Sequence, residues 1–228
     1  MAVLQVKRQE IKYQISLLEY KKLERNLKAC MRQDEYAGTD GTYRVRSLYF
    51  DTPLEKDRMD VLRGGEKRRK IRIRVYSPDD KTAKLELKAK EGRFQKKTSL
   101  SVTREEAEEL IQGRFECLRE KNTETAEHLY MELVRGMYRP RVMVEYQRAA
   151  FYIPFQEVRV TFDWNAAANR MNTDLFAKDI CWTPLRPSSV GVLEVKFNGY
   201  LFSYIQNLLE KVEKLPTMNG KYIYACNI

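Results

Sequence analysis

Histidine and cysteine are scarce in this 228-residue chain, and their scarcity narrows the chemistry that can be expected of it. The single histidine, His128, lies among residues with a helical pattern, so neither histidine-based catalysis nor a multi-histidine metal site is expected. The cysteines, Cys30, Cys117, Cys181 and Cys226, are far apart and include no C-x-x-C pair. A metal cluster and a disulfide framework are therefore both unexpected, and four reduced thiols are predicted.

Long apolar runs are absent as well. No stretch of about 18 apolar residues, the length that a membrane-spanning helix needs, occurs in the sequence. The first ten residues, MAVLQVKRQE, lead directly into charged sequence and lack the apolar core of a signal peptide. With 43% hydrophobic residues the chain can still bury a sizeable core. We expect one domain, residues 1–228, located in the cytoplasm and without a membrane span.

Positive charge is in clear excess. The chain has 42 lysines and arginines against 32 aspartates and glutamates, which gives a net charge of +10 and an isoelectric point of about 9.3. An excess of this size favours anionic partners, but it does not identify the anion. Nucleic acid, acidic lipid and small phosphates all remain open until the placement of the charges is considered.

Alternation of apolar and polar residues predicts about eight strands. We expect them over residues 10–15, 42–52, 67–77, 83–91, 94–102, 141–153, 157–165 and 190–199. Helices are expected after Ser16, a suitable N-cap, and after Thr103, which can form a capping box with Glu106. Two more are expected near 123–137 and 203–214. This pattern predicts an α+β fold: an eight-stranded antiparallel β-barrel with helices packed outside.

The charged residues of these strands gather on one face of each strand. Because side chains alternate with a period of two, Arg72 and Arg74 lie opposite Ile71 and Ile73. The charged faces hold Glu10 and Lys12; Lys70, Arg72 and Arg74; Lys84, Glu86, Lys88 and Lys90; Arg159 and Asp163; and Glu194 and Lys196. These faces repeatedly combine a carboxylate with several cations.

Such faces are either exposed to solvent or line the inside of a closed sheet. The second arrangement is favoured, because the helices outside need the apolar faces to pack against. An interior crowded with lysine and arginine repels itself unless an anion fills it, and phosphate chains suit it because arginine donates two hydrogen bonds to their oxygens. The carboxylates would then hold magnesium or manganese. Phosphoryl transfer needs this combination of neutralised charge and fixed positions.

Eight short motifs along the chain match one family in the same order. They are E-x-K-Y (Glu10 to Tyr13), S-L-Y-F-D-T (Ser47 to Thr52), R-K-I-R-I-R-x-Y (Arg69 to Tyr76), L-E-L-K-x-K (Leu85 to Lys90), Y-x-R (Tyr146 to Arg148), R-V-T-F-D (Arg159 to Asp163), L-E-V-K (Leu193 to Lys196) and K-Y (Lys221, Tyr222). With them the sequence resembles the VTC domain, the polyphosphate polymerase branch of the triphosphate tunnel metalloenzymes, a CYTH-like superfamily.

The resemblance implies an enzyme that transfers the terminal phosphate of a nucleoside triphosphate such as ATP to a growing polyphosphate chain, with Mn²⁺ or Mg²⁺. It implies phosphate contacts from Lys12, Arg72, Arg74, Lys88, Lys97, Arg148, Arg159, Lys196 and Lys221. It implies Glu194 as metal ligand, supported by Glu10 and Glu86. The catalytic set would be Lys12, Arg72, Arg74, Lys88, Arg148 and Glu194.

Two positions in this comparison stay open. Lys96 adjoins Lys97, so a shift of the strand by one residue would exchange them, and Arg93 is a further candidate cation. The family usually has S-K-Y near its C-terminus, whereas this chain has Gly220 before Lys221, so a hydroxyl contact to phosphate is missing from the pattern.

Other functions are compatible with the same residues. A tunnel-fold triphosphatase would let water attack the terminal phosphorus, and a binding module would hold polyphosphate or nucleotide without turnover. A nucleic-acid binder is not expected, because the aromatic residues tend to fall on the apolar faces of the strands. The nucleotide, the metal, the chain length of the product and the oligomeric state are not fixed by the sequence. An activating or tethering protein partner is also left open.

Overall fold

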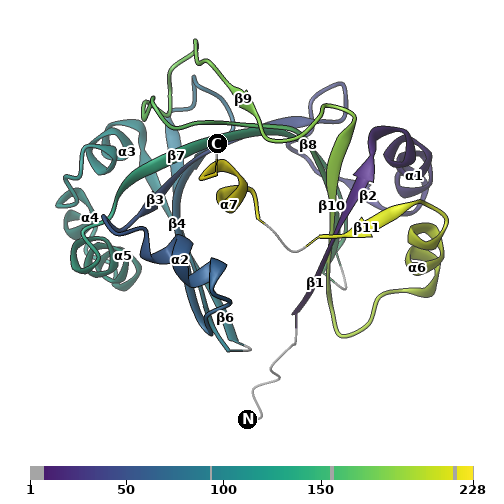
Figure 1. Ribbon diagram of the computed structural model, residues 1–228, viewed down its shortest axis with the longest axis horizontal. Helices are drawn as coiled ribbons and strands as arrows, with labels where there is room; N and C mark the ends of the chain where they lie inside the picture. Colours follow the sequence, from purple (N-terminus) through teal and green to yellow (C-terminus); the bar gives the residue numbers. More distant parts are fainter. Residues whose placement is uncertain (1–7, 93, 155–156, 218–219, 228) are drawn as a thin grey trace. The chain divides into compact units, whose positions relative to one another are not determined.

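A computed structural model of the chain describes residues 8–92, 94–154, 157–217 and 220–227. Most of its elements are labelled in Figure 1. The chain forms two compact units. Unit 1 consists of Met1–Arg44, Tyr146–Ala166 and Pro184–Asn219, and unit 2 of Val45–Glu145, Ala167–Thr183 and Gly220–Ile228.

In unit 1 the sheet has the strand order β11-β1-β10-β8-β7. These strands are β1 (Arg8–Ser16), β7 (Arg139–Ile153), β8 (Val158–Asn169), β10 (Val190–Asn198) and β11 (Lys214–Pro216), of which β7 and β8 continue into unit 2. The short β2 (Arg32–Gln33) pairs with β7, and the short β9 (Thr183–Pro184) pairs with β8. Strand β10 pairs antiparallel with both β1 and β8, so the three strands share one charged and one apolar face.

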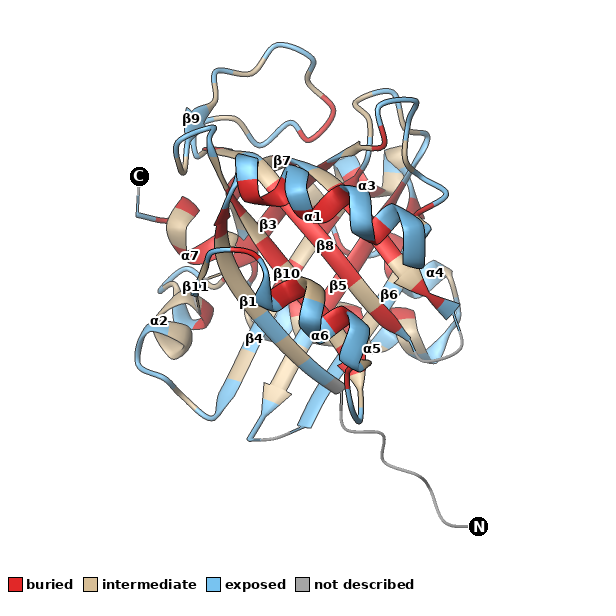
Figure 2. Cartoon of the chain, turned by 90° about the vertical axis from the view of Figure 1, so that its right-hand side faces the viewer, coloured by how far each residue is buried: buried red, intermediate tan, exposed pale blue. Residues whose placement is uncertain are grey.

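Helices α1 (Leu17–Cys30) and α6 (Ser203–Glu210) cover the apolar face of unit 1. Figure 2 shows both helices in front of buried stretches of β8 and β10. The predicted N-cap of α1 is confirmed, because the Ser16 hydroxyl accepts a hydrogen bond of 3.1 Å from the backbone N–H of Glu19. The core of this unit includes Ile15, Leu23, Leu27, Val160, Phe162, Leu193, Val195, Ile205 and Leu209.

In unit 2 the strand order is β7-β3-β4-β5-β6. Strands β3 (Tyr43–Asp51), β4 (Lys67–Val75), β5 (Thr82–Glu91) and β6 (Phe94–Thr103) form successive antiparallel pairs. The unit also contains α2 (Lys56–Leu62), α3 (Arg104–Ile111), α4 (Cys117–Glu120), α5 (Glu124–Arg135) and α7 (Lys221–Ala225). The predicted capping box of Thr103 and Glu106 is confirmed at the start of α3.

Helices α3, α4 and α5 lie on one side of the strands of unit 2 (Figure 1). Their buried residues join the apolar face of β3, β4 and β5 in a second core, which includes Leu48, Phe50, Ile71, Ile73, Leu85, Leu87, Leu110, Leu118, Leu129 and Leu133. The opposite face of these strands carries the alternating charged residues. The predicted separation of apolar and charged faces is therefore present in both units.

The prediction of an eight-stranded closed barrel was wrong. The described residues form eleven strands, and the sheet is open, because β6 pairs only with β5 and β11 only with β1 among them. The eight long strands match the predicted ones, whereas β2, β9 and β11 have two or three residues and are too short to show alternation. Alternation identifies the apolar face of a strand, but it carries no information on whether the edges of a sheet meet.

Three short helices, α2, α4 and α7, were not predicted; α4 has four residues and α7 five, fewer than two full turns each, so their patterns have no period to detect. All four cysteines are free thiols; Cys30 and Cys181 are exposed. No helix in the described part of the chain has the length and apolar character needed to cross a membrane.

Candidate functional site

The charged face of unit 2 is ordered in rows across three strands. Lys70 of β4 lies opposite Lys88 of β5, and Lys88 lies opposite Lys97 of β6. Partners in an antiparallel pair share a face of the sheet, so these three lysines form one row of like charge. Lys96 lies opposite Ala89 and so faces the other way. Of the two adjacent lysines, Lys97 is the one that shares a face with Lys88.

Glu86 is the centre of the next row. Its carboxylate is buried and contacts three cations: Arg72 through Nε at 2.8 Å, Arg74 at 3.2 Å and Lys97 through Nζ at 2.5 Å. Burial raises the pKa of Glu86, but the charges of Arg72 and Lys97 outweigh this effect and lower it. Glu86 is therefore an ionised group that fixes the positions of three cations.

Tyr49 of β3 extends this row to the C-terminal helix. Its hydroxyl accepts a hydrogen bond of 3.1 Å from Arg72, and its ring stacks on Tyr222 of α7 with centroids 5.1 Å apart. Burial raises the pKa of Tyr49, but Arg72, Lys70 and Lys221 together lower it below its ordinary value. The predicted phosphate contact Lys221 thus lies near the predicted contact Arg72.

Arg74 has unused hydrogen-bonding capacity. Its Nε is buried without a hydrogen-bond partner, although one terminal nitrogen contacts Glu86. Ser47, which lies opposite Arg74 in the β3–β4 pair, also has a buried hydroxyl without a partner. Buried polar atoms are nearly always paired, so two unsatisfied groups on one charged face indicate a place that a ligand oxygen can fill.

Helix α7 is held on unit 2 by a buried carboxylate. The Tyr222 hydroxyl donates to Asp51, which also accepts hydrogen bonds of 3.0 Å from the backbone N–H groups of Asp57 and Arg58. Asp51 therefore joins the start of α2 to α7. Because Lys221 directly precedes Tyr222 in the chain, this contact also holds the backbone of Lys221 in place.

Gly220 has a local reason to differ from the serine that the family resemblance implies. A Cβ atom at this position would lie 3.2 Å from the Lys70 ammonium nitrogen. That distance is tight, so a serine would require Lys70 to move. With glycine at position 220, the Lys70 ammonium group keeps its place in the row of lysines.

Asp57, which hydrogen-bonds to Tyr138 at 2.8 Å, provides a test of this buried network. Burial raises the pKa of Asp57 to about 6, with Tyr138 opposing and the Asp51 charge adding to the rise. Because the pKa of this carboxyl is higher in the folded than in the unfolded protein, its ionisation lowers the free energy of unfolding as pH rises from about 4 to about 6. Asp57→Asn should therefore raise the free energy of unfolding at pH 8 by about 1–3 kcal/mol.

Urea unfolding of Asp57→Asn at pH 4 and pH 8 measures this effect. The gain should be absent at pH 4, where the wild-type carboxyl is protonated in the folded protein. An equal change at both pH values would show that Asp57 does not titrate as described.

The charged face of unit 1 alternates in sign. Lys12 of β1 lies opposite Glu194 of β10, and in the next row Glu10 lies opposite Lys196. Across β10 and β8, Lys196 lies opposite Arg159. Each carboxylate is thus next to a cation along the strand and across it.

One set of ion pairs is formed by Glu10, Lys12, Glu194 and Lys196. Lys12 Nζ lies 3.3 Å from Glu194 and also contacts Glu10, while Lys196 contacts Glu194 and lies 3.9 Å from Glu10. Burial alone would lower the pKa of Lys12. The charges of Glu194 and Glu10 outweigh burial, so the pKa of Lys12 is raised. Burial lowers the pKa of Lys196 and prevails over both carboxylates.

Glu194 remains ionised in this setting. Burial raises its pKa, but Lys196 and Lys12 outweigh this effect and hold it far below its ordinary value. A depressed pKa of this kind contributes stability above the ordinary carboxyl pKa, and the contribution is lost on acidification.

Arg148 and Arg159 each have a carboxylate partner in unit 1. Arg148 donates from Nε and a terminal nitrogen to the two oxygens of Asp163, at 2.6 and 2.8 Å. Burial lowers the pKa of Arg148, but Asp163 outweighs it, so the arginine is firmly charged. Arg159 donates to Asp34 and, at 3.2 Å, to the Tyr43 hydroxyl. Asp163 was predicted to lie on the charged face of its strand, but neither its pairing with Arg148 nor a role for Asp34 was predicted.

The carboxylates differ in how well they fit a divalent metal. No group of three or more His, Cys, Asp or Glu side chains that could hold a metal occurs among the described residues. Mg²⁺ commonly needs only one or two carboxylates when substrate phosphates supply other ligands. Glu10 and Glu194 offer two carboxylates, and an ion bound there would displace Lys12 and Lys196, which contact both of them. Glu86 fits a metal less well, because it is a single carboxylate with three cations, Arg72, Arg74 and Lys97, around its oxygens.

The structure thus places the predicted residues in two groups. Unit 2 contains Arg72, Arg74, Glu86, Lys88, Lys97 and Lys221, and unit 1 contains Glu10, Lys12, Arg148, Arg159, Glu194 and Lys196. Arg93 lies outside the described residues. Tyr49, part of the S-L-Y-F-D-T motif, was interpreted as a packing residue; its hydroxyl contact with Arg72 was missed because alternation does not reveal it.

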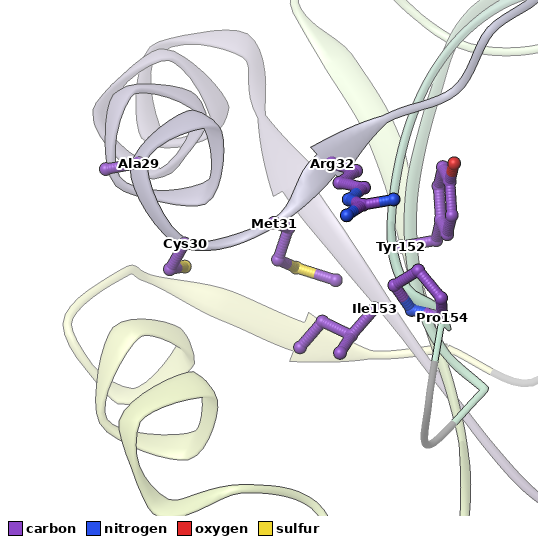
Figure 3. A pocket seen from close by; sticks show the side chains of 7 residues that line it. All are labelled: Ala29, Cys30, Met31, Arg32, Tyr152, Ile153 and Pro154. Atoms are coloured by element: carbon purple, nitrogen blue, oxygen red, sulfur yellow. The ribbon is translucent and has the colours of Figure 1, made fainter.

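An open pocket of about 420 Å³ in unit 1 is separate from these groups. It lies at the C-terminal end of α1, as Figure 3 shows. Its lining is Ala29, Cys30, Met31, Arg32, Tyr152, Ile153 and Pro154, which includes none of the residues predicted to contact phosphate or metal.

Comparison of the chain with known proteins identifies a matching family and similar solved structures. The model of the VTC domain family matches residues 7–228. No curated protein matches the chain significantly. A solved structure from Hippeastrum, HpAC1, is described as a candidate adenylyl cyclase with a dominant triphosphatase activity; it is 13% identical, with a TM-score of 0.56, over 93% of this chain and 92% of that one.

A second solved structure, from Bacillus halodurans, is described as a candidate adenylate cyclase. It is also 13% identical and covers 93% of this chain and 96% of that chain, with a TM-score of 0.48. At such identities a structural match concerns the fold alone.

Proposed function

The chain belongs to the VTC domain family, and on this basis we propose that it is a polyphosphate polymerase. It would transfer the terminal phosphate of a nucleoside triphosphate, with ATP as the first candidate, to a growing inorganic polyphosphate chain. Residues 1–228 would act as one domain. The observation that supports this proposal best is the charged face of unit 2, where cations far outnumber carboxylates and Arg74 has a buried, unpaired nitrogen.

The cations of unit 2 would bind phosphates, as would the predicted contacts Arg148 and Arg159 of unit 1. Lys70, Lys88 and Lys97 form a row of like charge, and Arg72, Arg74 and Lys97 share the carboxylate of Glu86. A triphosphate or polyphosphate carries several negative charges in a line, so it can neutralise such a row where a single small anion cannot. The guanidinium groups would fix the orientation of the chain through paired hydrogen bonds.

The acidic residues of unit 1 would hold the metal. Glu194 and Glu10 are the described carboxylates that fit Mn²⁺ or Mg²⁺, and the bound ion would neutralise phosphate charge during transfer. Lys12 and Lys196 already contact both carboxylates, so they would keep the two oxygen ligands in place when no metal is bound. The lowered pKa of Lys196, caused by burial, makes it the lysine of this pair that gives up its proton more readily.

Product analysis tests the proposal. Incubation of the purified protein with ATP and Mn²⁺ should yield ADP and polyphosphate chains that are resolved on a gel. ADP with only orthophosphate would identify a triphosphatase, an activity named for the similarly folded HpAC1. Tight triphosphate binding without ADP release would identify a binding module and contradict an enzymatic role.

Arg74→Ala tests the phosphate contacts directly. Loss of one charged hydrogen-bond donor costs about 1.5–3 kcal/mol, so the Kd for inorganic triphosphate should rise about 10- to 100-fold. Calorimetric titration measures this change, and circular dichroism should show an unchanged fold.

Arg69→Ala is the matched control. Arg69 lies on the same strand but on the opposite face, where it pairs with Glu132 at a distance of 2.8 Å. It should bind triphosphate as the wild type does. If both variants lost binding equally, the effect would come from net charge alone and the assignment of Arg74 would fail.

A further inference from the structure

One carboxylate in unit 1 joins a predicted phosphate contact to two tyrosines. Asp34, which is 7% exposed, accepts hydrogen bonds from the Arg159 guanidinium and, at 3.3 Å, from the Tyr43 hydroxyl. It also accepts one of 3.2 Å from the backbone N–H of Tyr36. The position of the Tyr36 backbone is therefore set by the same side chain that holds Arg159.

The segment that carries Tyr36 is itself held in place. The backbone N–H of Asp34 bonds to the Ala150 carbonyl of β7 at 2.9 Å, and the Gln33 side chain donates to the Gly41 carbonyl at 2.8 Å. Gly41 has a positive φ of 79°, which glycine adopts without strain. A turn of this kind keeps its aromatic side chain in one region and limits the entropy lost on binding.

The two tyrosine rings differ in exposure. Tyr36 as a whole residue is 65% exposed, and its ring meets the Tyr43 ring edge-on, with centroids 6.5 Å apart. Tyr43 also lies near Arg148, a second predicted phosphate contact. Burial lowers the pKa of Arg148 and Asp163 raises it most, and the Tyr43 hydroxyl adds to this rise. The accessible Tyr36 ring thus meets a tyrosine whose hydroxyl contacts Arg159, which is predicted to contact phosphate.

We propose that Tyr36, supported by Tyr43, forms a stacking platform for the base of the nucleoside triphosphate whose phosphates bind beside Arg159. This inference rests on the proposed function, which supplies the nucleotide. A nucleoside triphosphate combines an anionic chain with an aromatic base, and the Asp34 cluster offers an arginine and a tyrosine ring side by side. Stacking uses the face of the ring, which every base has. The platform therefore accepts any base and gives little discrimination between ATP and GTP.

The test compares two ligands that share the phosphate chain but differ in the base. ATP and inorganic triphosphate are titrated in EDTA, so that binding is measured without turnover. Removal of a stacking side chain weakens binding by about 5- to 100-fold per base, so Tyr36→Ala should raise the Kd for ATP by that factor. Its Kd for inorganic triphosphate should stay within about two-fold of the wild type, because the phosphate contacts are untouched. Tyr36→Trp, which keeps an aromatic face, should bind ATP at least as well as the wild type.

Tyr200→Ala is the matched control, since Tyr200 is 68% exposed in the same unit and its ring meets the Phe202 ring edge-on, with centroids 6.3 Å apart. It should leave both affinities unchanged. An unchanged ATP affinity in Tyr36→Ala would overturn the platform while leaving the phosphate contacts standing. An equal loss for ATP and triphosphate would overturn it too, by showing that Tyr36 acts only through Asp34 and Arg159. Failure of the wild type to bind either ligand would overturn both the platform and the proposed function.

Discussion

Glu86→Gln is expected to lower the midpoint of thermal unfolding by on the order of 10 °C in the absence of ligand. The substitution removes the carboxylate that Arg72, Arg74 and Lys97 share, and it leaves three cations to repel one another. Removing one partner of a buried ion pair costs about 3–5 kcal/mol, and in a protein of this size each kcal/mol lowers the midpoint by about 2–4 °C. Differential scanning calorimetry measures the change.

Inorganic triphosphate should partly restore the stability of Glu86→Gln, because the anion takes the place of the lost carboxylate. The rise in midpoint on adding triphosphate should accordingly be larger for the variant than for the wild type. Glu91→Gln is the control: Glu91 is on the same strand and pairs with Lys67, but both side chains are mostly exposed, so its midpoint should hardly change. A Glu86→Gln variant as stable as the wild type would show that the three cations do not depend on this carboxylate.

Glu194→Gln is expected to lower kcat for ATP consumption by about 10²- to 10³-fold, or more. An ion bound by Glu194 would stabilise transition-state charge by several kcal/mol, and each 1.36 kcal/mol corresponds to a factor of ten in rate. Binding of inorganic triphosphate should be kept or even strengthened, because the substitution removes a negative charge near the anion. Steady-state assays over a range of Mn²⁺ concentrations, combined with calorimetric titration of triphosphate, separate the two effects.

Glu210→Gln, at an exposed position of α6, serves as the control and should behave as the wild type does. Full activity of Glu194→Gln at ordinary Mn²⁺ concentrations would show that Glu194 does not hold the metal. Loss of triphosphate binding together with activity would give Glu194 a structural role through Lys12 and Lys196 instead.

The faces of the long strands could be predicted from the sequence because alternation is a local property. Arg72 and Arg74 share a face with Glu86, and Lys12 shares one with Glu194, as their spacing and strand pairing require. The N-cap at Ser16 and the capping box at Thr103 were equally local and were confirmed. The family was also recognised from short motifs, most of them within single strands, and its model matches residues 7–228.

Features that depend on distant partners could not be predicted in this way. Nothing local pairs Arg148 with Asp163 or Arg159 with Asp34, which is 125 residues away in the chain. The mixed sign of the charged faces suggested carboxylates as metal ligands, but the sequence does not reveal that Glu86 is enclosed by three cations. The barrel prediction failed for a related reason, since the two edges of a sheet are set by long-range geometry. The roles of individual site residues, and the expected cytoplasmic location, stay predictions.

The phosphate balance of the reaction distinguishes polyphosphate synthesis from hydrolysis of ATP. ATP consumed, orthophosphate released and acid-labile phosphate retained in chains are measured together, in one incubation of the protein with ATP and Mn²⁺. A polymerase predicts that almost every phosphate lost from ATP is recovered in chains, with little orthophosphate. Release of one orthophosphate for each ATP consumed, with no phosphate in chains, would contradict the account.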